Sequence, residues 1–233
     1  MFEQAEADEK AENGRSYPMA MWGAAMATVQ ILWQYSECEK GKEFLDKIPE
    51  ERDWITDKEE AYIKTGYSLY PKDLACAEDN QFKREKRIKK AMKNLSEKYP
   101  KESEASLFFA AASLAVSAQS KNTNAEVEKN IIKRLQSLEE SFPTHSGILH
   151  YIIHIFDTPK FYRIGNKLFL EEMIQPSEQK DHAASVGLRA AKNYMKVATS
   201  SCHGLHMPSH VFMRFGSWKE SLQSNYLSIK VNL

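Results

Sequence analysis

Glycine, proline and cysteine are all scarce in this sequence of 233 residues, which contains 9, 8 and 3 of them. Few chain breakers, together with the lack of alternating β-branched runs, argue against the tight turns and short strands of a β protein. The cysteines are odd in number and widely spaced, at Cys38, Cys76 and Cys202. Such a set does not suggest a disulfide framework, and we expect three reduced thiols.

Long apolar runs and an excess of one charge are also missing. No stretch of about 18 apolar residues occurs, so the sequence predicts no membrane span, and its polar start lacks the apolar core of a signal peptide. Lys plus Arg and Asp plus Glu both number 32, which gives no reason to expect nucleic acid as a partner. The basic stretch 83–90 has acidic neighbours and is typical of a solvated helix face. A cytoplasmic location is the default expectation.

Helical periodicity is what the sequence does contain. Ile88, Met92 and Leu95, for example, recur at the spacing of one helix face. Small residues, as in 23–25 and 110–112, let neighbouring helices approach closely, and the four tryptophans are expected to be packing residues. The pattern predicts helices over 2–12, 18–31, 38–47, 57–69, 82–98, 102–118, 125–141, 145–157, 181–196, 203–215 and 217–229.

An aromatic residue followed by proline punctuates the chain at Tyr17-Pro18, Tyr70-Pro71, Tyr99-Pro100 and Phe142-Pro143. Proline forces the preceding residue out of the α region and suits the first turn of the next helix. Pro100 and Pro143 lie 43 residues apart, a period found among helical repeats. These signals predict an all-α solenoid of about five helical hairpins, with a compact helical bundle as the alternative.

Two segments resemble parts of a tetratricopeptide (TPR) repeat: residues 17–27 resemble its helix A, and residues 215–221 the turn into helix B. The chain also resembles a family of TPR proteins with motifs like His-Tyr-Leu-Ile-His-Ala-Tyr-Asp and His-Ala-Leu-His-Met-Pro-Ser-His. Here they read His150-Tyr-Ile-Ile-His154-Ile-Phe-Asp157 and His203-Gly-Leu-His206-Met-Pro-Ser-His210. The likeness runs over nearly the whole chain and implies a single TPR-like solenoid over 1–233. It implies no particular activity.

The chain departs from the family's pattern in two places. Residues 160–179 separate Pro159 from His182, where family members pass quickly into the next helix. They indicate either a surface insertion at about 160–180 or an error in the gene prediction. The chain also starts inside a first repeat and ends at Leu233 without the polar helix that normally caps a repeat array, so we expect truncation at both ends.

The histidines are confined to one end of the chain. All seven lie within 66 residues, at positions 145, 150, 154, 182, 203, 206 and 210. On a helix, His150, His154 and Asp157 lie within roughly 60° of one another, and the three histidines of the second motif do likewise. The TPR resemblance implies that both motifs lie on helices A of successive repeats. Their axes would be roughly 10 Å apart along the concave groove.

Imidazoles in this arrangement are suited to a metal ion, because neutral histidine is the commonest ligand of Zn, Cu and Fe and i,i+4 pairs supply two ligands at a time. Asp157 would add a ligand or orient a histidine, and Cys202 is a soft ligand nearby in sequence. His145 and His182 lie near helix starts, and we expect them to be structural. The ligands predicted from sequence are therefore His150, His154, His203, His206 and His210, with Asp157 assisting.

Two functions are compatible with these residues. One is a TPR scaffold whose concave groove holds a protein, a peptide or a small ligand, with no membrane or nucleic-acid partner. The alternative is a metal-binding protein or a metalloenzyme, and an open coordination position would favour the enzyme. The His-Glu-x-x-His signature of metalloproteases is absent from the sequence. A third interpretation is that the histidines form a hydrogen-bonded structural cluster.

Overall fold

A computed structural model of the chain describes residues 1–33, 35–120, 125–157 and 182–231. The expected insertion at about 160–180 lies outside the described residues. The chain divides into two compact units, Met1–Lys121 (the N-terminal unit) and Asn122–Leu233 (the C-terminal unit).

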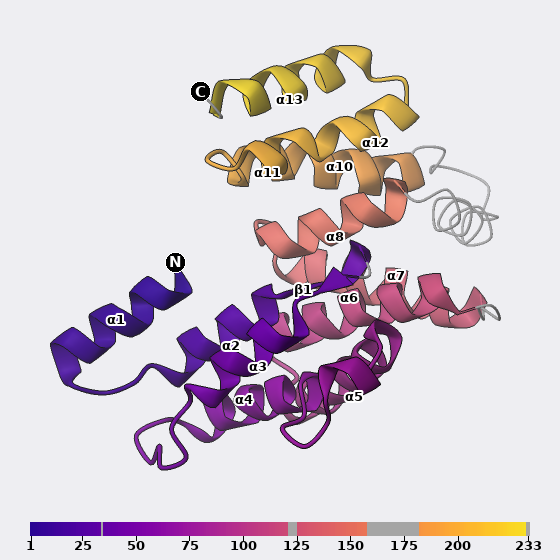
Figure 1. The fold of residues 1–233 in the computed structure, drawn as a ribbon. Coiled ribbons are helices and arrows are strands. Elements are labelled where there is room, and N and C mark those ends of the chain that lie inside the picture. The colour runs from indigo at the N-terminus through magenta and orange to yellow at the C-terminus, as the bar shows by residue number, and fades with distance from the viewer. Residues whose placement is uncertain (34, 121–124, 158–181, 232–233) are drawn as a thin grey trace. The chain divides into compact units, whose positions relative to one another are not determined.

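The N-terminal unit is built almost entirely of helices (Figure 1). They pack in the order α1 on α2, α2 on α3 and α4, α4 on α5, and α5 on α6. The elements are α1 (Phe2–Asn13), α2 (Pro18–Ala27), β1 (Val29–Gln30), η1 (Ile31–Trp33), β2 (Tyr35–Ser36), α3 (Cys38–Asp46), α4 (Asp57–Leu69), η2 (Cys76–Glu78), α5 (Gln81–Lys98) and α6 (Ser103–Gln119).

The C-terminal unit is helical throughout its described residues. Its elements are α7 (Ala125–Ser141), α8 (Ser146–Asp157), α10 (His182–Val197), α11 (Cys202–His206), α12 (Pro208–Arg214) and α13 (Trp218–Val231). Each helix packs on the next, α7 on α8, α8 on α10, α10 on α12 and α12 on α13, and Figure 1 shows these layers in sequence. The all-α class predicted from the sequence is confirmed.

The helix predicted over 18–31 ends earlier, at Ala27. The Thr28 hydroxyl donates to the Ala25 carbonyl at 2.7 Å, which competes with continuation of the helix. Residues 29–30 then pair in antiparallel fashion with residues 35–36, with Val29 opposite Ser36. The β-branched side chain of Val29 fits this extended conformation better than a helix end.

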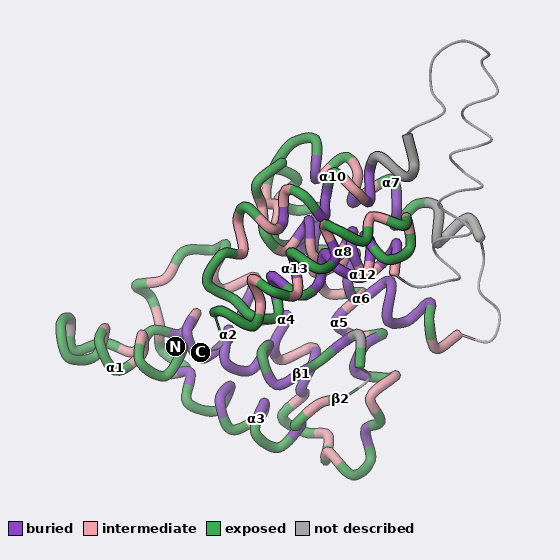
Figure 2. The backbone as a smooth tube through the Cα atoms, turned by 90° about the horizontal axis from the view of Figure 1, so that it is seen from above, coloured by how far each residue is buried: buried purple, intermediate pink, exposed green. Residues whose placement is uncertain are grey.

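Small residues bring the helices of the N-terminal unit close together, as predicted. Figure 2 shows α2 as largely buried, and Ala25 and Ala111 are fully buried. Trp22 packs in this core and its indole N–H donates to the Thr65 hydroxyl at 3.2 Å. The other three tryptophans do not serve as core residues, because Trp33, Trp54 and Trp218 are all exposed. The prediction that all four are packing residues is therefore wrong.

Cys38 and Cys76 form a disulfide, with Cα atoms 5.9 Å apart. The expectation of three reduced thiols is wrong for this pair and holds only for Cys202, which is free and exposed. The bond joins the first residue of α3 to η2 and closes a loop with a sequence separation of 38 that contains α4. Among the described residues, no helix has both the length and the apolar character needed to cross a membrane.

Glu85 is a fully buried carboxylate in α5. It accepts hydrogen bonds from the side-chain amides of Gln81 and Gln119. Burial raises the pKa of the Glu85 carboxyl, and the two amide donors offset part of that effect. Keeping the Glu85 carboxylate charged in the core therefore lowers the stability of the folded state.

We expect Glu85→Gln to stabilise the N-terminal unit by about 1 kcal/mol near neutral pH, because the amide avoids burying a charge. A carboxyl with a raised folded-state pKa contributes most to stability below its unfolded pKa, and this contribution is lost as the pH rises. The stability gained by Glu85→Gln over wild type should thus shrink as the pH falls. Guanidinium unfolding followed by tryptophan fluorescence, at two pH values, measures this difference in the free energy of unfolding. A difference that grows in acid would contradict this account.

Candidate metal centre

Helix α8 presents a histidine face because its other side is apolar. Ile148, Leu149, Ile152 and Ile153 are buried in the C-terminal unit, which fixes the rotation of the helix. His150 and His154, one turn apart, therefore share the opposite side with Asp157.

The second motif forms two short helices in place of one. The helix predicted over 203–215 is divided at Met207 into α11 and α12, since proline has no N–H to continue the hydrogen-bond ladder. Ser201 caps the start of α11 by accepting from the Gly204 N–H at 3.0 Å. Leu205 and Val211 are buried, which leaves the histidines of both short helices on the other side.

His150 and His154 form the first histidine pair. Their Nε2 atoms are 3.1 Å apart. Tyr194 of α10 stacks on the His150 ring, with centroids 5.3 Å apart, and the His203 ring of α11 meets it edge-on at 5.2 Å. Three helices thus contribute to the surroundings of His150.

The first pair is held in the neutral form. Burial, with the adjacent histidines as a smaller cause, lowers the pKa of His150 to about 3. The same causes lower the pKa of His154 to about 4, although Asp157 acts in the opposite direction. Burial also lowers the pKa of His203. Neutral imidazole is the form that ligates metals, so near neutral pH these rings need no proton removed before binding.

His206 and His210 form the second pair, with their Nε2 atoms 2.9 Å apart. The other ring nitrogen of each histidine contacts an oxygen. His210 Nδ1 is 3.1 Å from Asp157 Oδ2, and His206 Nδ1 is 2.7 Å from Asn225 Oδ1 of α13. Arg214 donates to the same Asp157 carboxylate at 3.1 and 3.0 Å. Asp157 therefore links α8 to α12.

The five histidines predicted as ligands thus gather in the C-terminal unit, and we call His150, His154, His203, His206 and His210 the histidine cluster. Asp157 lies beside His210, in the orienting position proposed for it. The Cys202 thiol is free and exposed. The backbone carbonyl of Cys202 accepts a hydrogen bond from the Ser228 hydroxyl of α13 at 2.7 Å. The side chain of His182 lies outside the described residues.

The contacts within the histidine cluster are pairwise. In the described part of the chain, no three His, Cys, Asp or Glu side chains already stand close enough together to hold one metal ion. Sequence reasoning also missed Tyr194, Asn225 and Arg214. No pattern in the sequence signals Tyr194 or Asn225, because each reaches a histidine from another helix of the folded unit, and Arg214 joins the site through Asp157.

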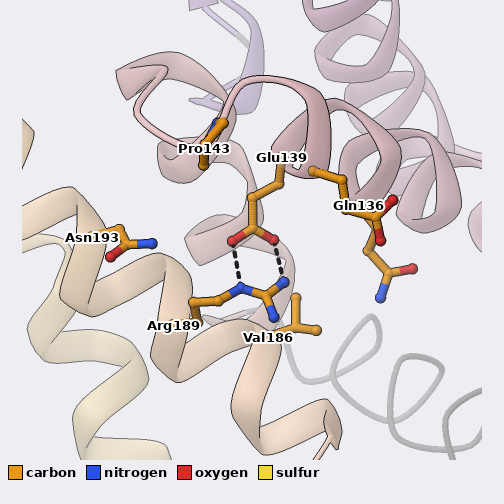
Figure 3. A pocket seen from close by; sticks show the side chains of 7 residues that line it. Gln136, Glu139, Pro143, Val186, Arg189 and Asn193 are labelled. Carbon is orange, nitrogen blue, oxygen red and sulfur yellow. Dashed lines mark hydrogen bonds and ion pairs between the residues drawn. The ribbon is translucent and has the colours of Figure 1, made fainter.

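A separate cavity of about 210 Å³ lies between α7 and α10 (Figure 3). Glu139, which is almost fully buried, accepts two hydrogen bonds from Arg189, from Nε at 2.9 Å and Nη2 at 2.8 Å. None of the predicted metal ligands lines this cavity, whose walls are Gln136, Glu139, Glu140, Pro143, Val186, Arg189 and Asn193.

Comparisons with known proteins give no match: no family model, no curated protein and no solved structure matches this chain.

Proposed function

We propose that the C-terminal unit binds a transition-metal ion through the histidine cluster. The observation that carries the proposal is the pairing of imidazoles on neighbouring helices, with Nε2 atoms 3.1 Å apart in one pair and 2.9 Å apart in the other. Two nitrogens that bind one ion in adjacent coordination positions lie about this close together, because each metal–nitrogen bond is about 2.0–2.1 Å long.

The spacing of each pair also bears on the metal. An ion about 2.0–2.1 Å from both nitrogens would bind them at an angle of about 90–100°, which is closer to square-planar or octahedral geometry than to a tetrahedron. This favours Cu(II) or Fe(II) over Zn(II). His203 lies one turn before His206, so a side-chain rotation could bring a third imidazole to the second pair.

A hydrogen bond between the two rings of each pair is the alternative to a metal ion. The histidines would then form a structural cluster. Metal titration of the wild type and of a variant without one pair separates the two functions, because a purely structural cluster would show no tight, stoichiometric binding that is lost with that pair.

For the full chain stripped with a chelator, we expect Cu(II) to bind with a stoichiometry near one, as measured by calorimetry. The double variant His206→Ala/His210→Ala should lose at least about 100-fold in affinity, because imidazole nitrogen is the preferred donor for this ion. His145→Ala is the matched control, since His145 lies outside the cluster, and should bind like wild type. Circular dichroism checks that the helices persist. Equal affinity in the double variant and the control would remove the proposal.

The architecture around the cluster supports a TPR-like solenoid, in which helical hairpins stack in chain order. The sequential packing of α7, α8, α10, α12 and α13 is of this kind. A protein or peptide partner in a concave groove stays a prediction, as does the boundary of a single solenoid over 1–233.

The disulfide supports a location other than the predicted cytoplasm. Structural disulfides form and persist mainly in oxidising compartments, while cytosolic thiols are kept reduced. We therefore infer that the protein works in an oxidising environment, on the basis of the Cys38–Cys76 bond.

A further inference from the structure

The Asn225 side chain of helix α13 reaches the histidine cluster. The polar side of α13 faces α11 and α12, where the Ser224 hydroxyl donates to the Leu205 carbonyl and the Ser228 hydroxyl to the Cys202 carbonyl. Asn225 lies on this same side, with its Oδ1 2.7 Å from His206 Nδ1. The neighbouring serine bonds hold α13 in place independently of Asn225.

The orientation of the Asn225 amide follows from its second hydrogen bond. Its Nδ2 donates to the Ser221 carbonyl at 3.1 Å, and a carbonyl oxygen can only accept. The oxygen of the amide therefore points at His206, and an amide oxygen also only accepts. His206 must in turn donate from Nδ1, so in its neutral form Nε2 carries a lone pair.

His210 has the same proton arrangement for a different reason. Its Nδ1 faces Asp157 Oδ2, while Asp157 Oδ1 accepts from Arg214, so the carboxylate serves as a hydrogen-bond acceptor on both sides. With both Nδ1 atoms donating, two ring acceptors face each other 2.9 Å apart. Two lone pairs at this distance repel unless a cation lies between them.

We propose that Asn225 is a positioning residue for the metal centre: it fixes the Nδ1–H tautomer of His206 and thereby aims the Nε2 lone pair at the ion. The positioning role rests on the proposed metal function. The Nδ1–H tautomer of His206 does not, because it is expected in the metal-free protein as well. Asn225 does for His206 what Asp157 does for His210, so one ligand of the pair is oriented from α8 and the other from α13.

The test compares three variants of the full chain. Asn225→Leu removes the acceptor, Asn225→Asp keeps it, and Ser228→Ala is the matched control. Ser228 ties α13 to α11 through an equivalent hydrogen bond but contacts no histidine ring in the bonds described here. Long-range proton–nitrogen NMR spectra report which ring nitrogen of His206 carries the proton in metal-free protein, and calorimetry with Cu(II) reports affinity.

We expect His206 to be protonated on Nδ1 in wild type, Asn225→Asp and Ser228→Ala, and to become a mixture of tautomers in Asn225→Leu. Affinity for Cu(II) should fall about 10–100-fold in Asn225→Leu alone. Wild-type His206 protonated on Nε2, or an unchanged tautomer in Asn225→Leu, would overturn the proposal. So would an equal loss of affinity in Ser228→Ala, which would mean that Asn225 acts only through helix packing. A wild-type protein with the expected tautomer but no metal affinity would overturn the metal function instead.

Discussion

Replacing Cys38 and Cys76 together by alanine is expected to lower the free energy of unfolding of the N-terminal unit by about 4 kcal/mol. The bond closes a loop with a sequence separation of 38, and the entropy that this cross-link removes from the unfolded chain amounts to about 4 kcal/mol in the chain-entropy model. Alanine is preferred to serine because Cys38 is buried, and a hydroxyl there would need a hydrogen-bond partner.

Tryptophan fluorescence during guanidinium unfolding is a suitable measurement, because Trp22, Trp33 and Trp54 all belong to the N-terminal unit. Cys202→Ala is the control, since this thiol is free and exposed, and it should leave the transition unchanged. If the double variant unfolds within about 1 kcal/mol of wild type, the bond contributes far less than its loop length implies. Detection of three free thiols in unreduced protein would mean that it does not form.

The disulfide marks a limit of sequence reasoning. Periodicity located the helices within a few residues, because each apolar stripe is a local property of the chain. Which cysteines meet depends on how α3 and η2 pack, and the spacing of Cys38 and Cys76 carries no information about that packing. The odd number of cysteines was also misleading. One unpaired thiol, here Cys202, makes the number odd even though the other two cysteines are bonded.

The histidine cluster was more predictable, because its members are spaced by whole helical turns. The i,i+4 spacing of His150 and His154 predicts neighbouring rings, and their Nε2 atoms are in fact 3.1 Å apart. Asn225 and Tyr194 could not be found this way, because they come from other helices and only the fold brings them to the rings.

Arg189→Leu is expected to destabilise the C-terminal unit by about 3 kcal/mol, because it leaves the buried Glu139 carboxylate without its cation. Glu139 is 2% exposed, and both hydrogen bonds described for its carboxylate come from Arg189. The pair joins α7 to α10 (Figure 3). Helix α8, which carries His150 and His154, packs against both of these helices. Removal of Arg189 alone is therefore expected to lower the free energy of unfolding by more than the intact Glu139–Arg189 pair contributes to it.

The double variant Glu139→Leu/Arg189→Leu tests this reasoning, because it removes both charges and should recover most of the lost stability. Thermal unfolding followed by circular dichroism measures this effect. A double variant as unstable as Arg189→Leu would mean that Arg189 stabilises the unit through its packing and not by compensating the charge of Glu139.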